Sequence, residues 1–178
     1  MSHPDFSLAD IIPGQGAIIL VDKPRGPSSH QVAAWVREMT SVPSVGHTGT
    51  LDPPVSGVLV VLLGRAVRLT TILHQDEKEY IALLRLQGDV PDAELCKVIE
   101  HFTGRIYQRP PKRSAVKRAL RIREIHELEM LDRDGRLVLL RVRCDSGTYI
   151  RSLCHHIGLA CGVGGAMIEL RRTRSGPF

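Results

Sequence analysis

The sequence predicts one domain of the α/β (α+β) class, built on a mixed sheet flanked by helices. Three observations predict this class. Residues 57–63 form a short, wholly apolar run, as in a buried strand. Residues 149–160 repeat apolar side chains at helical spacing. Residues 123–131 and 136–144 flank the turn sequence 132–135, as in a β-hairpin. A chain of 178 residues is also long enough to bury a substantial core.

The N-terminal elements begin with a polar, glycine-containing segment. Residues 1–15 predict a flexible arm, and the folded domain is expected over residues 16–178. Residues 17–21 predict a buried strand, and Ser28 or Ser29 can cap the helix that follows. Because Trp35 lies among apolar residues at helical spacing in this helix, we expect it in the core.

The later elements follow in chain order. A helix is expected from residue 65 to about residue 74, a strand over residues 78–86, and a helix from residues 91–92 onward. A basic Pro-Pro loop precedes the hairpin. After the helix of residues 149–160, a glycine-rich turn leads to a last strand over residues 167–172.

The charge of the chain is basic, with 24 Lys and Arg against 19 Asp and Glu. Eight basic residues and no acid lie between residues 105 and 123, which suits either a phosphate backbone or a solvated face. The four cysteines show neither Cys-x-x-Cys nor zinc spacing, so reduced thiols are expected. Without a signal pattern or a membrane-length apolar run, the sequence predicts a cytoplasmic protein, or a nuclear one in a eukaryote.

Residues 46–53, GHTGTLDP, carry the most informative chemistry. They place the carboxylate of Asp52 on a glycine-bearing turn between two apolar segments, and Pro53 stiffens its exit. A lone Asp-Pro pair is usually a surface turn. Here His47 and two threonines add hydrogen-bonding groups around the acid, so the turn is a candidate active site.

Five ordered motifs, from about residue 16 to the last residue, resemble those of the TruB superfamily of pseudouridine synthases. They are GHTGTLDP (46–53) together with DKPRGPSSH (22–30), KEY (78–80), GTYIRSL (147–153) and LRRTRSG (170–176). The resemblance implies a largely antiparallel sheet of the pseudouridine synthase fold. It also implies isomerisation of uridine to pseudouridine in tRNA or guide-directed rRNA, without a metal or redox cofactor.

The resemblance assigns a role to each candidate residue. Asp52 is the nucleophile, and attack on the sugar or on the base ring both stay open. Arg151 pairs with Asp52, and Tyr80 stacks on a flipped uracil. The implied substrate contacts are His47, Tyr149, Leu170 and Lys23, with RNA-backbone contacts at Arg109, Lys112, Arg113, Lys117 and Arg118.

Residues 108–118 and 170–178 are similar to the archaeal and eukaryotic dyskerin-type branch, the catalytic subunit of H/ACA guide-RNA particles. That similarity implies RNA and H/ACA-particle proteins as partners, with the chain a monomer within a complex. Members of this branch continue into further catalytic elements and a PUA domain. The sequence contains no counterpart of these regions, so we expect a catalytic domain without a PUA domain and with a sheet incomplete at its C-terminus.

Without the family resemblance, the residue patterns also permit purely structural roles and other functions. Without the motifs, Tyr80 would be a half-buried strand residue, Arg151 a surface helix residue and Leu170 a core residue. A catalytically silent module that binds RNA or a ribonucleoprotein is the second functional hypothesis. A carboxylate-dependent hydrolase is disfavoured because no second acid is in evidence.

Overall fold

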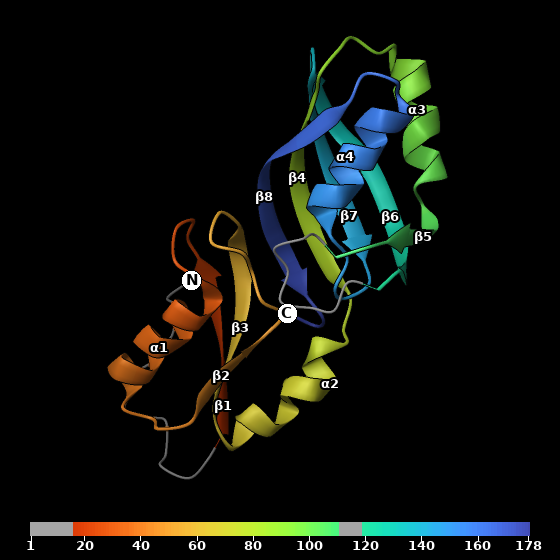
Figure 1. Ribbon diagram of the computed structural model, residues 1–178. Helices are drawn as coiled ribbons and strands as arrows, with labels where there is room; N and C mark the ends of the chain where they lie inside the picture. Colours follow the sequence, from red (N-terminus) through yellow and green to blue (C-terminus); the bar gives the residue numbers. More distant parts are fainter. Residues whose placement is uncertain (1–15, 111–118) are drawn as a thin grey trace, which may run out of the picture. The chain divides into compact units, whose positions relative to one another are not determined.

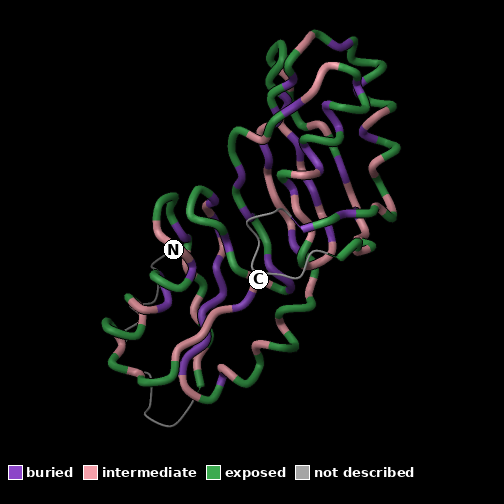
Figure 2. The backbone as a smooth tube through the Cα atoms, viewed as in Figure 1, coloured by how far each residue is buried: buried purple, intermediate pink, exposed green. Residues whose placement is uncertain are grey.

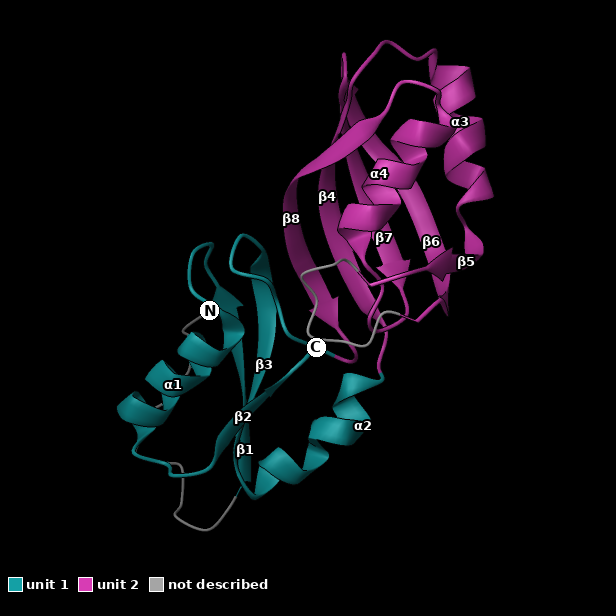
Figure 3. Cartoon of the chain, in the orientation of Figure 1, with its two compact units in different colours: residues 1–75, 178 teal, residues 76–177 magenta. Residues whose placement is uncertain are grey.

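The computed structural model describes residues 16–110 and 119–178 (Figure 1). The predicted arm of residues 1–15 and four of the basic residues, Lys112, Arg113, Lys117 and Arg118, lie outside the described residues. Buried residues alternate with accessible ones along residues 137–144 and residues 82–86 (Figure 2). The chain divides into two compact units, residues 1–75 with residue 178, and residues 76–177 (Figure 3). The single catalytic domain expected over residues 16–178 stays a prediction.

The first unit is built around one buried strand. Its elements are β1 (Gly16–Lys23), α1 (Ser29–Thr40), β2 (Val45–Thr48), β3 (Ser56–Gly64), the 3₁₀ helix η2 (Arg65–Leu69) and α2 (Thr70–His74). β1 pairs with residues 57–64 of β3, and β2 pairs with residues 60–63 of β3, both antiparallel. Every residue from 59 to 63 is at most 1% exposed, because partners and packing cover the strand on all sides.

Helix α1 begins at a serine cap and buries only a narrow stripe. The Ser28 hydroxyl accepts a hydrogen bond from the Gln31 backbone N–H at 3.1 Å. The buried positions of the helix are Ser29, Val32 and Ala33. The expectation that Trp35 lies in the core is wrong, since this side chain is 44% exposed. Residue 35 falls outside the stripe that contacts the strands.

The second unit contains β4 (Lys78–Leu86), α3 (Asp92–His101), β5 (Gly104–Gln108), β6 (Arg121–Asp134), β7 (Leu137–Cys144), α4 (Ile150–Ala160) and β8 (Gly165–Ser175). Its five strands form an antiparallel sheet in the order β8-β4-β7-β6-β5. Helix α4 packs against β8 and β4. A Cβ atom on Gly158 of α4 would lie 2.2 Å from the Gly165 nitrogen, so this close approach requires glycine.

The α+β class with a largely antiparallel sheet is confirmed. The hairpin is longer than predicted, because β6 extends to Asp134 and the chain turns at Gly135, where φ is +55°. Strands β2 and β5 were not predicted as strands, since each is short and contains a glycine. No helix within residues 16–110 and 119–178 combines the length and apolarity that a membrane crossing requires.

The four cysteines are free thiols, as expected, and three of them are buried. Burial raises the pKa of Cys144 and of Cys154 to about 12. It also raises the pKa of Cys161. These thiols therefore behave as small apolar core groups, whereas Cys96 is exposed.

Candidate active site

The loop between β2 and β3 presents Asp52 to solvent. Gly49 enters it with φ of +67°, a conformation that glycine adopts without strain. Leu51 and Val55 are each 3% exposed, whereas Asp52 between them is exposed. The Val55 N–H donates to the Asp52 carbonyl at 3.0 Å. Two buried apolar side chains therefore anchor the loop while its carboxylate stays accessible.

The first residue of α1 holds this loop just before the acid. The Ser29 hydroxyl donates to the Leu51 carbonyl at 2.9 Å and accepts from the Leu51 N–H at 2.8 Å. Ser29 is 0% exposed, so water does not compete for either bond. Of the two serines that could cap α1, Ser28 performs the capping and Ser29 clamps the loop.

Lys23 supports the loop just after the acid. The Pro53 carbonyl accepts from the Gly26 N–H at 2.8 Å and from the Lys23 Nζ at 3.5 Å. The same Nζ donates to the carbonyls of Pro24 and Pro27, each at 2.9 Å. Lys23 is 0% exposed; burial lowers its pKa, and the charge of Asp52 raises it in part. Lys23 therefore organises the loop backbone, and its contact with substrate stays a prediction.

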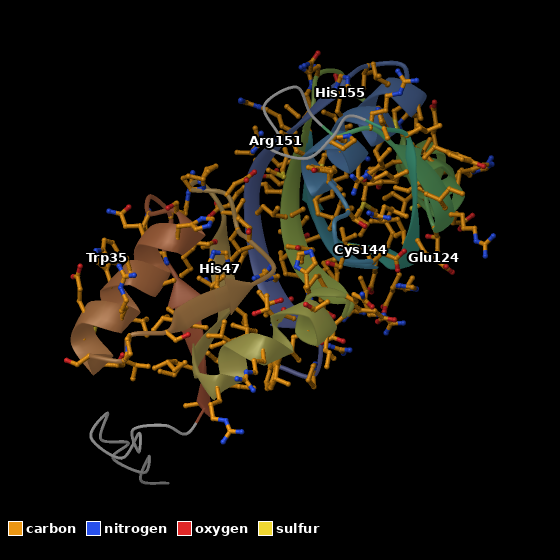
Figure 4. The ribbon with its side chains drawn as sticks, turned by 60° about the horizontal axis from the view of Figure 1, so that its bottom comes forward. Trp35, His47, Glu124, Cys144, Arg151 and His155 are labelled. Atoms are coloured by element: carbon orange, nitrogen blue, oxygen red, sulfur yellow. The ribbon has the colours of Figure 1, made fainter. Side chains whose placement is uncertain are left out.

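His47 lies on β2, ahead of the loop. His47 is labelled in Figure 4. Its side chain is half-buried, and its ring meets the ring of His30 on α1 edge-on, with the centroids 4.8 Å apart. The expected contact of His47 with RNA stays a prediction.

Tyr80 and Leu170 lie on one face of the second unit's sheet. Tyr80 on β4 is opposite Val142 on β7 and Arg172 on β8, while Ala82 is opposite Leu170. Alternate residues of a strand share a face, so Tyr80 and Leu170 are diagonal neighbours. The structure thus brings together two of the predicted base contacts.

Two buried cations flank Tyr80 on the same face. Lys78 is 2% exposed and Arg172 is 1% exposed. The Lys78 Nζ donates to the Asp76 carbonyl at 2.9 Å. Burial, and then the charge of Arg172, lower the pKa of Lys78 to about 8. Sequence reasoning missed this pair, because charged residues that alternate along a strand normally indicate a solvent-facing side.

A buried glutamine holds the start of α4. The Gln108 side chain accepts from the Tyr149 N–H at 2.9 Å and donates to the Tyr149 carbonyl at 3.1 Å. Gln108 is 2% exposed, and Tyr149 is the residue that precedes α4. Arg151 is exposed in the first turn of α4, two residues after the clamped Tyr149 (Figure 4). Gln108 begins the segment 108–118 that carries the dyskerin-type similarity, but the sequence assigned this glutamine no role of its own.

The predicted site residues are divided between the units. Asp52, His47 and Lys23 belong to the first unit, and Tyr80, Arg151 and the other contacts belong to the second. A site that uses all of them requires both units, so the pairing of Asp52 with Arg151 stays a prediction. Arg109 is exposed at the end of β5. Within the described residues, no three His, Cys, Asp or Glu side chains are grouped to hold a metal ion.

Curated relatives match most of the chain. A probable tRNA pseudouridine synthase B of Picrophilus torridus is 56% identical over 160 residues, covering 90% of this chain and 46% of the relative. That of Methanocaldococcus jannaschii is 55% identical over 161 residues, covering 90% of this chain and 48% of the relative. The chain thus spans about half the length of the curated relatives it matches.

Solved structures agree with the sequence matches. A Cbf5–Nop10–Gar1 complex matches with a TM-score of 0.90 and 51% identity, over 100% of this chain and 56% of the matched chain. An H/ACA RNP bound to a substrate RNA containing 2′-deoxyuridine matches with a TM-score of 0.83 and 51% identity, over 90% of this chain and 48% of the matched chain. The model of the TruB family pseudouridylate synthase N-terminal domain matches residues 37–150, and that of the tRNA pseudouridylate synthase B C-terminal domain matches residues 151–178. The chain therefore belongs to the TruB family of pseudouridylate synthases.

Proposed function

We propose that this chain is the catalytic part of an RNA pseudouridine synthase that isomerises uridine to pseudouridine. The observation that carries the proposal is the loop of Asp52, an exposed carboxylate on a backbone held from both sides by Ser29 and Lys23. Membership in the family supports the reaction class.

The reaction mainly requires the protein to position its catalytic groups next to the uridine. The N1–C1′ bond of uridine breaks, a C5–C1′ bond forms, the C5 proton leaves, and N1 gains a proton. Atoms and electrons balance without a further reactant. Asp52 acts as the nucleophile, and a loop already held in place avoids the loss of entropy that ordering it would require.

The other groups hold the base. The target uridine leaves its stack, which costs a few kcal/mol and favours unpaired RNA. Tyr80 stacks on the uracil, with Leu170 beside it on the same sheet face. Arg151 pairs with Asp52 and favours its ionised form, while Tyr149 contacts the nucleotide.

The substrates and partners follow from the relatives. Because matched proteins are named tRNA pseudouridine synthase B and a matched structure is an H/ACA RNP bound to substrate RNA, we propose tRNA and guide-directed rRNA as substrates. We propose Nop10-like and Gar1-like proteins as partners, from the Cbf5–Nop10–Gar1 complex. The basic segment with Arg109 contacts the RNA backbone, and the cytoplasm is the proposed location.

Loss of the C5 proton provides the test. RNA that carries tritium at C5 of uridine is incubated with the chain alone, and with guide RNA and partner proteins. We expect tritium release from the wild type, none from Asp52→Asn, and normal release from Asp134→Asn, an exposed carboxylate on the β6–β7 hairpin.

Two results would contradict the proposal in different ways. Release by Asp52→Asn at the wild-type rate refutes Asp52 as the nucleophile. RNA binding by the wild type without release in either arm identifies a catalytically silent module instead.

A further inference from the structure

A cavity of about 350 Å³ lies within the first unit, between α1 and β2. It lies ahead of Asp52 along the chain, and of its lining residues only His47 was given a role above, as an expected RNA contact. We call it the α1–β2 pocket. Its lining residues are His30, Ala33, Ala34 and Arg37 of α1, and Val45, Gly46 and His47 of β2.

The hollow results from the sizes of the facing residues. His30, Ala33, Ala34 and Arg37 are spaced so that they share one face of α1. The two alanines lie between the longer side chains, and Gly46 opposite contributes no side chain. A larger residue at position 34 would fill the space.

The lining of the pocket favours an anion. It contains no acidic residue, and Arg37 is a permanent cation with a planar set of N–H donors. The imidazoles of His30 and His47 add N–H donors at 4.8 Å between ring centroids. His30 and Arg37 are exposed, so a ligand can reach both from solvent. A phosphate oxygen fits a guanidinium of this kind with short, charge-assisted hydrogen bonds.

We propose that the α1–β2 pocket binds a backbone phosphate of the RNA strand that carries the target uridine, with Arg37 and His30 as its principal contacts. The inference rests on the proposed function. β2 leads directly into the loop of Asp52, so one short segment joins the pocket to the nucleophile. A phosphate held there would fix the register of the strand while the uridine is extruded.

A salt titration of RNA binding tests the proposal. The full chain and its Arg37→Gln variant are titrated with a uridine-containing single-stranded RNA at several salt concentrations, followed by fluorescence anisotropy. Loss of one phosphate contact should reduce the slope of log K against log salt by about 0.7. The matched control is Arg68→Gln, which removes another exposed arginine of the same unit outside the pocket and should leave the slope unchanged. An unchanged slope in Arg37→Gln, or an equal reduction in Arg68→Gln, overturns the proposal.

A second variant changes the shape of the pocket and not its charge. Ala34→Leu should weaken RNA binding about as much as Arg37→Gln does, provided that its thermal melt matches the wild type. Wild-type affinity in a folded Ala34→Leu protein contradicts the proposal. Arg37→Gln alters an exposed side chain, so its result decides the question even if Ala34→Leu fails to fold.

Neutral linkages identify the bound group. One methylphosphonate at the contacted position should weaken binding to the wild type and have no further effect on Arg37→Gln. Equal sensitivity of the two proteins at every position refutes a phosphate contact at Arg37. Displacement of the RNA by micromolar uridine monophosphate would indicate a mononucleotide site and overturn the assignment to the RNA backbone.

Tritium release in the same samples separates this inference from the proposed function. If Arg37→Gln lowers the salt slope but the wild type releases no tritium, the pocket stands and the enzymatic proposal fails. If the wild type releases tritium and the slopes are equal, the enzymatic proposal stands and the pocket fails. When the enzymatic proposal and the pocket proposal are both correct, Arg37→Gln should raise KM for RNA with little change in kcat.

Discussion

The hydroxyl of Ser29 is the most specific support of the Asp52 loop, and its removal gives the sharpest prediction. Ser29→Ala deletes one atom that makes two hydrogen bonds to the Leu51 backbone, at 2.8 and 2.9 Å. Both Ser29 and Leu51 are buried, so solvent does not replace the missing partner. The variant therefore leaves a buried N–H and a buried carbonyl unsatisfied directly before Asp52.

The magnitude follows from those two groups. A buried polar group left without its partner costs about 1–3 kcal/mol, which gives about 2–4 kcal/mol for the pair after partial relaxation. For a chain of this length, 1 kcal/mol shifts Tm by about 2–4 °C. We therefore expect Ser29→Ala to lower Tm by about 5–15 °C, and to lower kcat at temperatures where the protein stays folded.

The matched control is Ser28→Ala at the neighbouring position. It removes the α1 cap, whose hydroxyl bonds the Gln31 N–H, and it leaves the loop untouched. Loss of a cap costs about 1 kcal/mol, or about 2–4 °C. Calorimetry and tritium release on both variants provide the measurement. If Ser29→Ala has the same Tm as Ser28→Ala, or keeps the wild-type kcat, the support of the Asp52 loop by Ser29 is refuted.

Three further predictions concern the second unit. Gln108→Leu removes both hydrogen bonds to the Tyr149 backbone. It should lower the free energy of unfolding in urea by about 1–3 kcal/mol and reduce kcat/KM. Wild-type values for both quantities would contradict the role of Gln108 in holding the start of α4. Lys78 has a folded-state pKa of about 8 against 10.5 for the free side chain, so the unfolded chain binds more protons between these values and stability should rise with pH there. Relative to Lys78→Met, the wild type should gain about 1–2 kcal/mol from pH about 7.5 to pH about 9.5, and a constant difference would refute the shift. A thiol reagent at neutral pH should label Cys96 alone in the native protein and all four cysteines in denaturant; mass spectrometry that finds a second labelled thiol in the native state would disprove the burial.

Several elements could be predicted from the sequence because their signals are local. The apolar run in β3, the helical spacing in α4 and the alternation in β7 each depend on neighbours along the chain. Trp35 shows the limit of such signals. Helical spacing indicates that an apolar face exists, but the partner surface decides how much of that face is covered, and at Trp35 it leaves 44% exposed.

The candidate site divides in the same way. Asp52, Tyr80 and Arg151 could be proposed from motifs, because unusual residue orders carry information without any contact being known. The roles of Ser29, Gln108 and Arg37 could not be predicted, because each residue acts on a group distant in sequence or on a hollow formed by two elements.

The sequence by itself determined the fold class, the family and the carboxylate on which the chemistry is proposed to depend. Only the tertiary structure decided that Ser28 caps helix α1 while Ser29 holds the loop of Asp52. It also decided that the Lys23 amine donates hydrogen bonds to backbone carbonyls. The physical reason is that hydrogen-bond partners and cavities depend on which segments meet in space. Two adjacent serines are identical in chemistry, so the sequence alone does not indicate which partner each one binds.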